Sequence, residues 1–340
     1  MKIGIIAPSS RVPAVELGIS VEKLKSSGFL IEVHPQCKKS DLYYSGSDLE
    51  RAVAFYDYAR RGDLDVLWCA RGGYGAVRLL PLLDQMVMKL GIPGKKLLVG
   101  SSDATSLLDY VKNRWGWSVL HAPMPGLRNF SILEKSEWNS LLNWIRGEKP
   151  EKPWNGVRLK FYYQPQVAFS SGAIVAPVVG GNLTIVTSMV GTSYSSRFQD
   201  KIVFLEDVDE ALYRIDRLIQ QNILAGTFQG AKAIVLGNFL NCQDYPPLGL
   251  KSKPKTANLK RVMKAPKPKE LAATRKRVPF EKGIRGTFES LGKLLEIPVV
   301  SGLPVGHGPD HFSLPLGGRY ELDQKGNFSL IDWDWLKSRN

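Results

Sequence analysis

The chain has few of the residues on which disulfide-bonded, metal-binding and membrane proteins depend. Its 340 residues include three cysteines, which lie far apart, form no CxxC pair and have no metal-ligand spacing. Isolated cysteines in odd number argue against a disulfide framework and favour reduced, structural thiols. No stretch approaches the roughly 20 apolar residues of a membrane span, and the apolar run after Lys2 is too short for a secretory signal. We therefore expect a cytoplasmic protein without a membrane span.

Positive charge is in excess, but it is concentrated in one segment. The net charge is +14, and residues 251–285 supply +11 of it through 13 Lys or Arg residues and two acids. Prolines interrupt this segment, so we expect an extended basic insertion at the surface. It contains one aromatic residue, Phe280, which disfavours base stacking on nucleic acid. Attraction of the segment to an anionic surface, polymer or partner is the alternative interpretation.

Length and patterning predict two domains. Residues 1–150 alternate strand-like and helix-like stretches, which predicts an α/β domain with a mostly parallel sheet covered on both faces. A polar, proline-containing connection at 146–156 follows, and beyond it short strands and glycine turns dominate. We expect a smaller, strand-rich second domain at 157–335, with helices at 209–224 and 287–296. Ligands collect at the carboxyl ends of parallel strands, so the turns at that edge are the candidate site.

One of these turns carries two adjacent serines. The strand-like residues 96–99 run directly into Gly100-Ser101-Ser102-Asp103, where a helix-like stretch begins. A serine on such a turn projects its hydroxyl outward, and the free N–H groups of the helix start can stabilise a developing oxyanion. Ser and Asp are also favoured helix N-caps, and the local pattern alone favours the cap. The turn is not the G-x-S-x-G elbow, because Ala104 occupies the position of the second glycine.

A serine nucleophile needs a base, and the chain has only four histidines. His307 lies between two glycines after the strand-like residues 298–300, in a loop that leaves its imidazole accessible. His311 is four residues further on, but the glycine and proline between them break the helix that such a metal-binding pair needs, so we expect no metal. His121 either lines the same cleft or has a structural role. Nothing in the sequence around His34 points to a catalytic role for it.

The base in turn needs an acid that orients it. Glu206 ends the apolar strand 202–205 and opens an acidic cluster that includes Asp209 and Glu210. The dipole of the following helix accounts for Asp209 and Glu210 at its N-terminus. It accounts less well for Glu206, which lies at the strand end. Glu206 is therefore the candidate acid.

A glycine-rich turn, Arg71-Gly72-Gly73-Tyr74-Gly75, follows another predicted strand. Its backbone N–H groups are available as hydrogen-bond donors at the same edge of the sheet. It lacks the lysine of a P-loop and the spacing of a dinucleotide fingerprint, so a phosphate-binding role is disfavoured.

Seven short motifs occur in order along most of the chain, and together they resemble the LD-carboxypeptidase family of serine peptidases, which includes the microcin-immunity hydrolases. The last of the seven has two parts, which are given together. The motifs are Ile6-Ala7-Pro8-Ser9-Ser10, Ser45-Gly46-Ser47-Asp48-Leu49-Glu50-Arg51, Arg71-Gly72-Gly73-Tyr74-Gly75, Gly100-Ser101-Ser102-Asp103, Gly180-Gly181-Asn182-Leu183, Leu205-Glu206-Asp207-Val208, and Pro304-Val305-Gly306-His307 with Leu314-Pro315-Leu316-Gly317.

The resemblance implies a Ser–His–Glu triad at the interface of a flavodoxin-like N-terminal domain and a C-terminal domain. Carried over by motif, the nucleophile is Ser102, the general base His307 and the orienting acid Glu206. The resemblance also implies a homodimer and needs neither metal nor cofactor. The family usually has a bulky residue before the nucleophile, so Ser101 stays open as the attacking serine. The remaining implied site residues are Gly73 and Asp103 for the oxyanion hole, and Gly72, Tyr74, Ser101 and His121 for substrate binding.

Three functions are compatible with these features. The first is a cytoplasmic carboxypeptidase that removes D-alanine from meso-diaminopimelate in murein tetrapeptides during cell-wall recycling. The second is a microcin-immunity amidase acting on an acyl-adenylate analogue, for which Trp154 or Tyr194 is the candidate for stacking on the base. The third, of another class, is a non-catalytic protein that binds its partner through residues 251–285.

Overall fold

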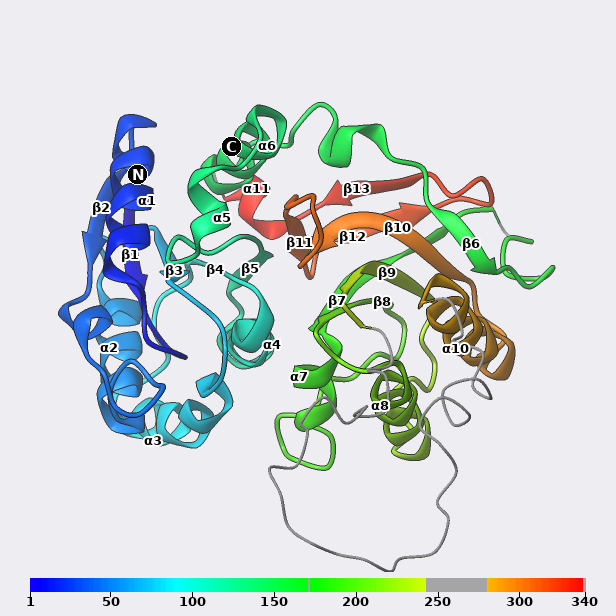
Figure 1. Ribbon diagram of the computed structural model, residues 1–340, viewed down its shortest axis with the longest axis horizontal. Coiled ribbons are helices and arrows are strands. Elements are labelled where there is room, and N and C mark those ends of the chain that lie inside the picture. Colours follow the sequence, from blue (N-terminus) through cyan, green and yellow to red (C-terminus); the bar gives the residue numbers. More distant parts are fainter. Residues whose placement is uncertain (171, 243–279, 339–340) are drawn as a thin grey trace, which may run out of the picture.

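The computed structural model describes residues 1–170, 172–242 and 280–338 and contains two β-sheets in that part of the chain (Figure 1). Most of the predicted basic segment, residues 251–279, lies outside the described residues. Its last six residues, 280–285, open a helix and do not continue the insertion, because apolar residues recur there at helical spacing. The predicted start of this helix at residue 287 was therefore wrong by seven residues.

The N-terminal sheet has the strand order β2-β1-β3-β4-β5, in which every pair is parallel. This is the order of a flavodoxin-like sheet, and the predicted fold class is confirmed. Apolar residues fill both sides of β3 and β4, as expected for strands covered on both faces. The strands are β1 (Lys2–Ile6), β2 (Leu30–Val33), β3 (Val66–Cys69), β4 (Leu97–Gly100) and β5 (Ser118–His121).

Helices cover this sheet, and local capping explains where several of them begin and end. Helix α2 starts with a capping box, in which Ser47 and Glu50 satisfy each other's backbone N–H groups. Gly116 and Gly147 stop α4 and α6 in the left-handed conformation. The helices are α1 (Ala14–Ser26), α2 (Asp48–Arg60), α3 (Leu80–Leu90), α4 (Thr105–Trp115), α5 (Arg128–Ser131) and α6 (Lys135–Arg146), with 3₁₀ turns η1 (Pro35–Lys38), η2 (Ala76–Leu79), η3 (Ser102–Ala104) and η4 (Pro153–Gly156).

The second sheet has the order β13-β12-β7-β8-β9-β10-β6. Its central strands β7 to β10 are parallel, and β12, β13 and β6 join antiparallel at the edges. The strands are β6 (Lys160–Tyr163), β7 (Ile174–Asn182), β8 (Ile202–Val208), β9 (Ala233–Leu240), β10 (Val299–Gly306), β12 (Arg319–Leu322) and β13 (Phe328–Asp332).

Three helices, α7, α8 and α10, pack on one face of the second sheet and close a core of their own (Figure 1). Ile215 and Ile219 of α8 point into this core, as their spacing predicts. The predicted helix began at Asp209, but α8 begins three residues later, because Asp209 has positive φ and bonds to the end of β9. The helices are α7 (Leu183–Ser188), α8 (Leu212–Leu224), α10 (Phe280–Leu295) and α11 (Asp334–Lys337).

A short strand from the end of the chain ties the two sheets together. β11 (Leu314–Leu316) follows β10 in sequence, yet it pairs antiparallel with β5 at the edge of the N-terminal sheet. Leu314 thereby lies opposite His121, at the strand end where the candidate residues gather. Leu314 and Leu316 are buried in a hydrophobic core that includes residues of both sheets, and this burial stabilises the pairing of β11 with β5. Within the described residues, no helix is long and apolar enough to cross a membrane.

Candidate functional site

The turn after β4 holds Ser102 in a strained backbone conformation. Ser102 has φ +56, in the left-handed region, whereas Ser101 is extended with φ −156. A left-handed non-glycine residue costs about 1–3 kcal/mol and persists only where its surroundings enforce it. Among the described residues the Ser102 hydroxyl forms no hydrogen bond, and neither serine side chain caps the following turn. Ser101 therefore occupies the N-cap position of this turn without the side-chain hydrogen bond that the N-cap interpretation predicts.

The glycine-rich turn after β3 packs directly against Ser102. A Cβ atom on Gly72 would lie 2.9 Å from Ser102 Cβ and 3.1 Å from its Oγ. Gly73 has φ +102, and a Cβ there would lie 2.2 Å from the Oγ atom of Ser10. Both positions therefore require glycine, since a side chain on Gly72 would collide with Ser102 and one on Gly73 would collide with Ser10.

Ser10, at the end of the loop after β1, fixes the glycine-rich turn. Its N–H donates to the Gly72 carbonyl at 3.2 Å, and its Oγ accepts from the Tyr74 N–H at 3.2 Å. The Gly73 N–H between them donates no hydrogen bond among the described residues. Tyr74 is 44% exposed and clusters with Tyr43 and Tyr44 beside the turn.

Glu206 lies on β8 and His307 directly follows β10, on either side of β9 in the second sheet, and their side chains form a direct contact. The Nδ1 atom of His307 lies 2.7 Å from Oε2 of Glu206, whose side chain is fully buried. Gly306 has φ +114, and a Cβ on it would lie 2.8 Å from that same oxygen. Glycine before the histidine therefore leaves room for the carboxylate.

Charge pairing changes the pKa values of both groups. Burial raises the pKa of Glu206, but the attraction and hydrogen bond of His307 outweigh it and hold the pKa below its usual value. Burial lowers the pKa of His307, but Glu206 outweighs it and holds that pKa above its usual value. The bond uses Nδ1, so Nε2 is the ring nitrogen that remains for proton transfer.

A cavity of about 220 Å³ lies where the two sheets meet. Ser101 lines it from the N-terminal sheet, and Gly306 and His307 line it from the second sheet. A second link joins the two sides, because the Asn182 N–H donates to Thr105 Oγ1 at 3.2 Å. Asn182 in turn is paired with Glu206 across β7 and β8. Of the predicted site residues, Ser101, His121 and His307 line this cavity, whereas Ser102 and Glu206 do not. No hydrogen bond joins Ser102 to His307 in the described residues.

His121 also lines this cavity, at the end of β5. Its ring is buried and packs edge-on against Phe204 at 5.2 Å, and neither nitrogen has a hydrogen-bond partner in the part of the chain that the structure describes. Burial lowers its pKa to about 4, outweighing the attraction of Glu206, so the ring is neutral at neutral pH. A buried polar group without a partner is rare, and in a cavity wall it is available to water or a ligand.

Two polar residues that line the cavity, His311 and Asn129, were not predicted as site residues from the sequence. His311 Nε2 lies 3.2 Å from Asn129 Nδ2, and both residues line the cavity. Only the closeness of His311 to His307 in sequence pointed to it, and Asn129 had no signal. Metal-type clusters of three or more His, Cys, Asp or Glu side chains do not occur in the residues that the structure describes.

The aromatic residues expected to stack on a nucleobase lie elsewhere. Trp154 is buried, stacks on Tyr320 and Phe328, and donates its indole N–H to the Ser313 carbonyl at 3.0 Å. Tyr194 donates its hydroxyl to Asp84 at 2.7 Å, in a groove at the far end of α4. Neither residue lines the cavity with His307, so neither expectation holds.

Comparison with known proteins agrees with this arrangement. Residues 3–122 match the LD-carboxypeptidase N-terminal domain, and residues 175–322 match the LD-carboxypeptidase C-terminal domain. The crystal structure of muramoyltetrapeptide carboxypeptidase from Oxalobacter formigenes superposes with a TM-score of 0.73 at 26% identity, covering 98% of this chain and 99% of that one.

Curated relatives align along nearly the whole chain. The murein tetrapeptide carboxypeptidase of Pseudomonas aeruginosa is 25% identical over 93% of this chain and 91% of its own length. The probable murein peptide carboxypeptidase of Bacillus subtilis is 24% identical over 97% and 91%. The microcin C7 self-immunity protein of Escherichia coli is 25% identical over 92% and 87%. Because both characteristic domains are matched in order, the chain belongs to the LD-carboxypeptidase family of peptidases.

Proposed function

We propose that this peptidase is a serine carboxypeptidase that cleaves the L,D-bond between meso-diaminopimelate and the terminal D-alanine of murein tetrapeptides. The observation that carries the proposal is the Glu206–His307 contact beside a cavity that Ser101 also lines. The strain at Ser102 and its packing against Gly72 support Ser102, not Ser101, as the nucleophile. Relatives that are named for murein peptides supply the substrate class.

The proposed reaction begins with attack of Ser102 Oγ on the carbonyl carbon of the scissile amide. His307 Nε2 takes the hydroxyl proton, and Glu206 holds the ring and stabilises its positive charge. The tetrahedral oxyanion accepts hydrogen bonds from the N–H groups of Gly73 and Asp103. Among the described residues the Gly73 N–H has no other partner, and the Asp103 N–H belongs to the first turn after β4.

The intermediate then collapses and the C–N bond breaks. The D-alanine amine leaves with the proton held by His307, and the diaminopimelate carbonyl stays bound to Ser102 as an ester. Water attacks the ester after giving a proton to His307, which returns it to Ser102 as the tripeptide leaves. We assign substrate contacts to the neutral ring of His121 and to Ser101, which line the cavity. We also assign them to Gly72 and Tyr74 of the glycine-rich turn.

The proposal is tested by incubating the protein with murein tetrapeptide and measuring tripeptide and D-alanine by mass spectrometry. We expect tripeptide from the native protein and none from Ser102→Ala, with circular dichroism unchanged. Intact tetrapeptide after incubation with the native protein, in a reaction where an added known carboxypeptidase cleaves it, would refute the murein assignment. Full activity in Ser102→Ala with loss in Ser101→Ala would move the nucleophile by one residue.

A microcin-immunity type of amidase is the second candidate, favoured by the relative from Escherichia coli. The burial of Trp154 removes one of its expected base-stacking residues. An aminoacyl sulfamoyl adenosine, assayed in parallel with tetrapeptide, separates the two, since the higher kcat/KM identifies the substrate class. A phenotype that survives Ser102→Ala but is lost on deletion of residues 251–279 would instead support the non-catalytic binding protein.

The cellular setting is proposed from the same relatives and from the sequence. We propose that the protein works in the cytoplasm as a homodimer, with murein recycling as its process. Sedimentation velocity tests the dimer, and cell fractionation tests the compartment.

A further inference from the structure

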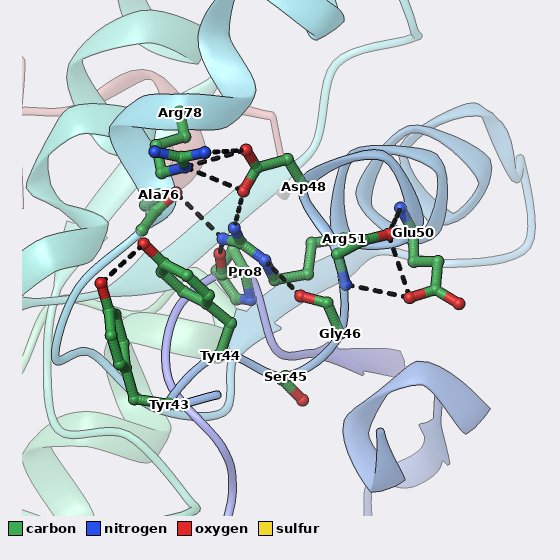
Figure 2. Close-up of polar contacts among 12 residues, drawn as sticks. Pro8, Tyr43, Tyr44, Ser45, Gly46, Asp48, Glu50, Arg51, Ala76 and Arg78 are labelled. Atoms are coloured by element: carbon green, nitrogen blue, oxygen red, sulfur yellow. Dashed lines mark hydrogen bonds and ion pairs between the residues drawn. The ribbon is translucent and has the colours of Figure 1, made fainter. Parts of the chain in front are cut away.

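Arg51 is a buried arginine that joins three loops at the carboxyl edge of the N-terminal sheet (Figure 2). It lies on α2, and its side chain is 0% exposed. Its Nε donates to the Gly46 carbonyl at 3.1 Å, and its Nη1 donates to the carbonyls of Pro8 and of Gly75, the latter at 2.9 Å. Asp48, three residues earlier on the same helix, forms an ion pair with Nη2 of Arg51. One side chain therefore fixes the loop after β1, the loop before α2 and the glycine-rich turn.

The Gly75–Ala76 peptide bond is held from both sides. Arg51 binds its carbonyl, and Oδ2 of Asp103 accepts its N–H, donated by Ala76, at 2.8 Å. Asp103 directly follows Ser102 and is 1% exposed. The contact thus joins the glycine-rich turn to the turn that carries the candidate nucleophile.

Steric and charge effects reinforce this clamp. A Cβ on Gly75, which has φ +124, would lie 2.8 Å from Arg51 Nη1, so only glycine lets the guanidinium reach the carbonyl. The Tyr44 ring covers the guanidinium at 4.6 Å. Burial raises the pKa of Asp103, and the Ser9 hydroxyl, the nearby backbone N–H groups and, least of all, the attraction of Arg51 oppose that rise. Burying a cation is costly unless its hydrogen-bond donors are satisfied, and here backbone carbonyls satisfy them.

We propose that Arg51 and Asp103 are positioning residues that set the separation between the Gly73 and Asp103 N–H groups, the two donors of the oxyanion hole. The inference rests on the proposed serine mechanism. Such donors act only when they point at the oxyanion, and small displacements of catalytic groups cost up to about 100-fold in rate. Arg51 lies behind the turn and binds Gly75, two residues from the donor, so its loss displaces the donor without removing it.

The test compares Arg51→Lys and Arg51→Met with a matched control, Arg61→Met. Arg61 also forms ion pairs with carboxylates, Glu32 and Asp63, but it follows α2 and precedes β3, at the opposite edge of the sheet. The measured quantities are kcat and KM for tetrapeptide, the rate of Ser102 labelling by a fluorophosphonate, the inhibition constant of a peptide boronic acid, and the melting temperature.

We expect kcat to fall about 10- to 100-fold in both Arg51 variants while KM stays within about two-fold. Fluorophosphonate labelling should slow, and boronate affinity should weaken, by comparable factors, because both reactions place an oxygen in the oxyanion hole. The melting temperature of Arg61→Met should fall, while its kcat should stay unchanged. If Arg51→Met does not fold, the kcat and labelling rate of Arg51→Lys test the positioning role of Arg51.

Two results would overturn the proposal. One is a folded Arg51→Lys with native kcat and native labelling rate. The other is a rise in KM at constant kcat, which would indicate a role in substrate binding. Fluorophosphonate labelling needs no murein substrate, so a native protein that is labelled at Ser102 but leaves tetrapeptide intact would refute the proposed substrate and leave this inference standing.

Discussion

The carboxylate of Glu206 lies completely buried 2.7 Å from the Nδ1 atom of His307. Glu206 is the strongest negative charge acting on this ring, and Asp207 and Asp209 contribute less. The polar residues that line the cavity beside His307 are Ser101, Asn129 and two further histidines. The contact selects which ring nitrogen carries the hydrogen bond and leaves the other for chemistry.

Replacing Glu206 with Gln should keep the hydrogen-bonding shape and remove the charge. We expect kcat to fall by about 100- to 10,000-fold, as for the orienting acid of other triads. The reaction needs neutral His307, whose pKa is raised by Glu206, so activity is lost as pH falls through that raised value. In Glu206→Gln the acid limb of the residual kcat/KM profile should move to lower pH. An acid limb at its native position would contradict the assignment.

The same pair gives a pH dependence of stability. The pKa of Glu206 is lowered, so its contribution is complete above the unfolded value near 4.5 and is lost as pH falls through the folded value. The pKa of His307 is raised, so its contribution is complete below the unfolded value near 6.5 and is lost as pH rises through the folded value. The melting temperature difference between native protein and Glu206→Gln should therefore be greatest between these two values. Calorimetry across this range checks it, and a difference that does not change with pH would contradict it.

The strained turn can be tested by two substitutions that both remove the nucleophile. Ser102→Ala and Ser102→Gly should each lose at least about 1,000-fold in kcat. Only glycine adopts φ +56 without strain, so we expect Ser102→Gly to be more stable than Ser102→Ala by about 1 kcal/mol. Urea denaturation of the two variants measures the difference. An alanine variant of equal or greater stability would mean that the turn stores no strain.

Gly72→Ala should impair catalysis through contact with the nucleophile. Its Cβ would lie 2.9 Å from Ser102 Cβ, closer than carbon atoms pack, so Ser102 has to move. We expect kcat to fall at least about 10-fold. Gly62→Ala is the control, because a Cβ there meets nothing within 4 Å. Equal activity of the two variants would show that Ser102 tolerates the displacement.

His121→Phe separates a substrate contact from a structural role. Within the described residues the native ring has no hydrogen-bond partner at either nitrogen, and such a group costs about 1–3 kcal/mol when buried. We expect phenylalanine to preserve or raise the melting temperature and to raise KM for tetrapeptide about 10-fold. Unchanged KM together with a lower melting temperature would assign His121 to the core.

Local patterns in the sequence were sufficient for most elements of the N-terminal domain. The strands at 2–6 and 66–69 and the helix at 48–60 are read from apolar spacing and capping residues within a few positions of one another. The same patterns could not place β11, which follows a strand of the second sheet in sequence but pairs with β5 of the N-terminal sheet. Strand pairing can join segments that are far apart in the chain, and β5 and β11 are separated by almost 200 residues.

The sequence by itself determined the candidate Ser102, Glu206 and His307, through ordered motifs that resemble one family. Only the tertiary structure decided that Glu206 bonds Nδ1 of His307, that Ser102 is strained against Gly72, and that Trp154 is buried. It also assigned a partner to Arg51, which the sequence presented as one member of a motif. Residue type and local spacing limit what chemistry is available, whereas distances, burial and charge pairing arise from contacts between segments that folding brings together.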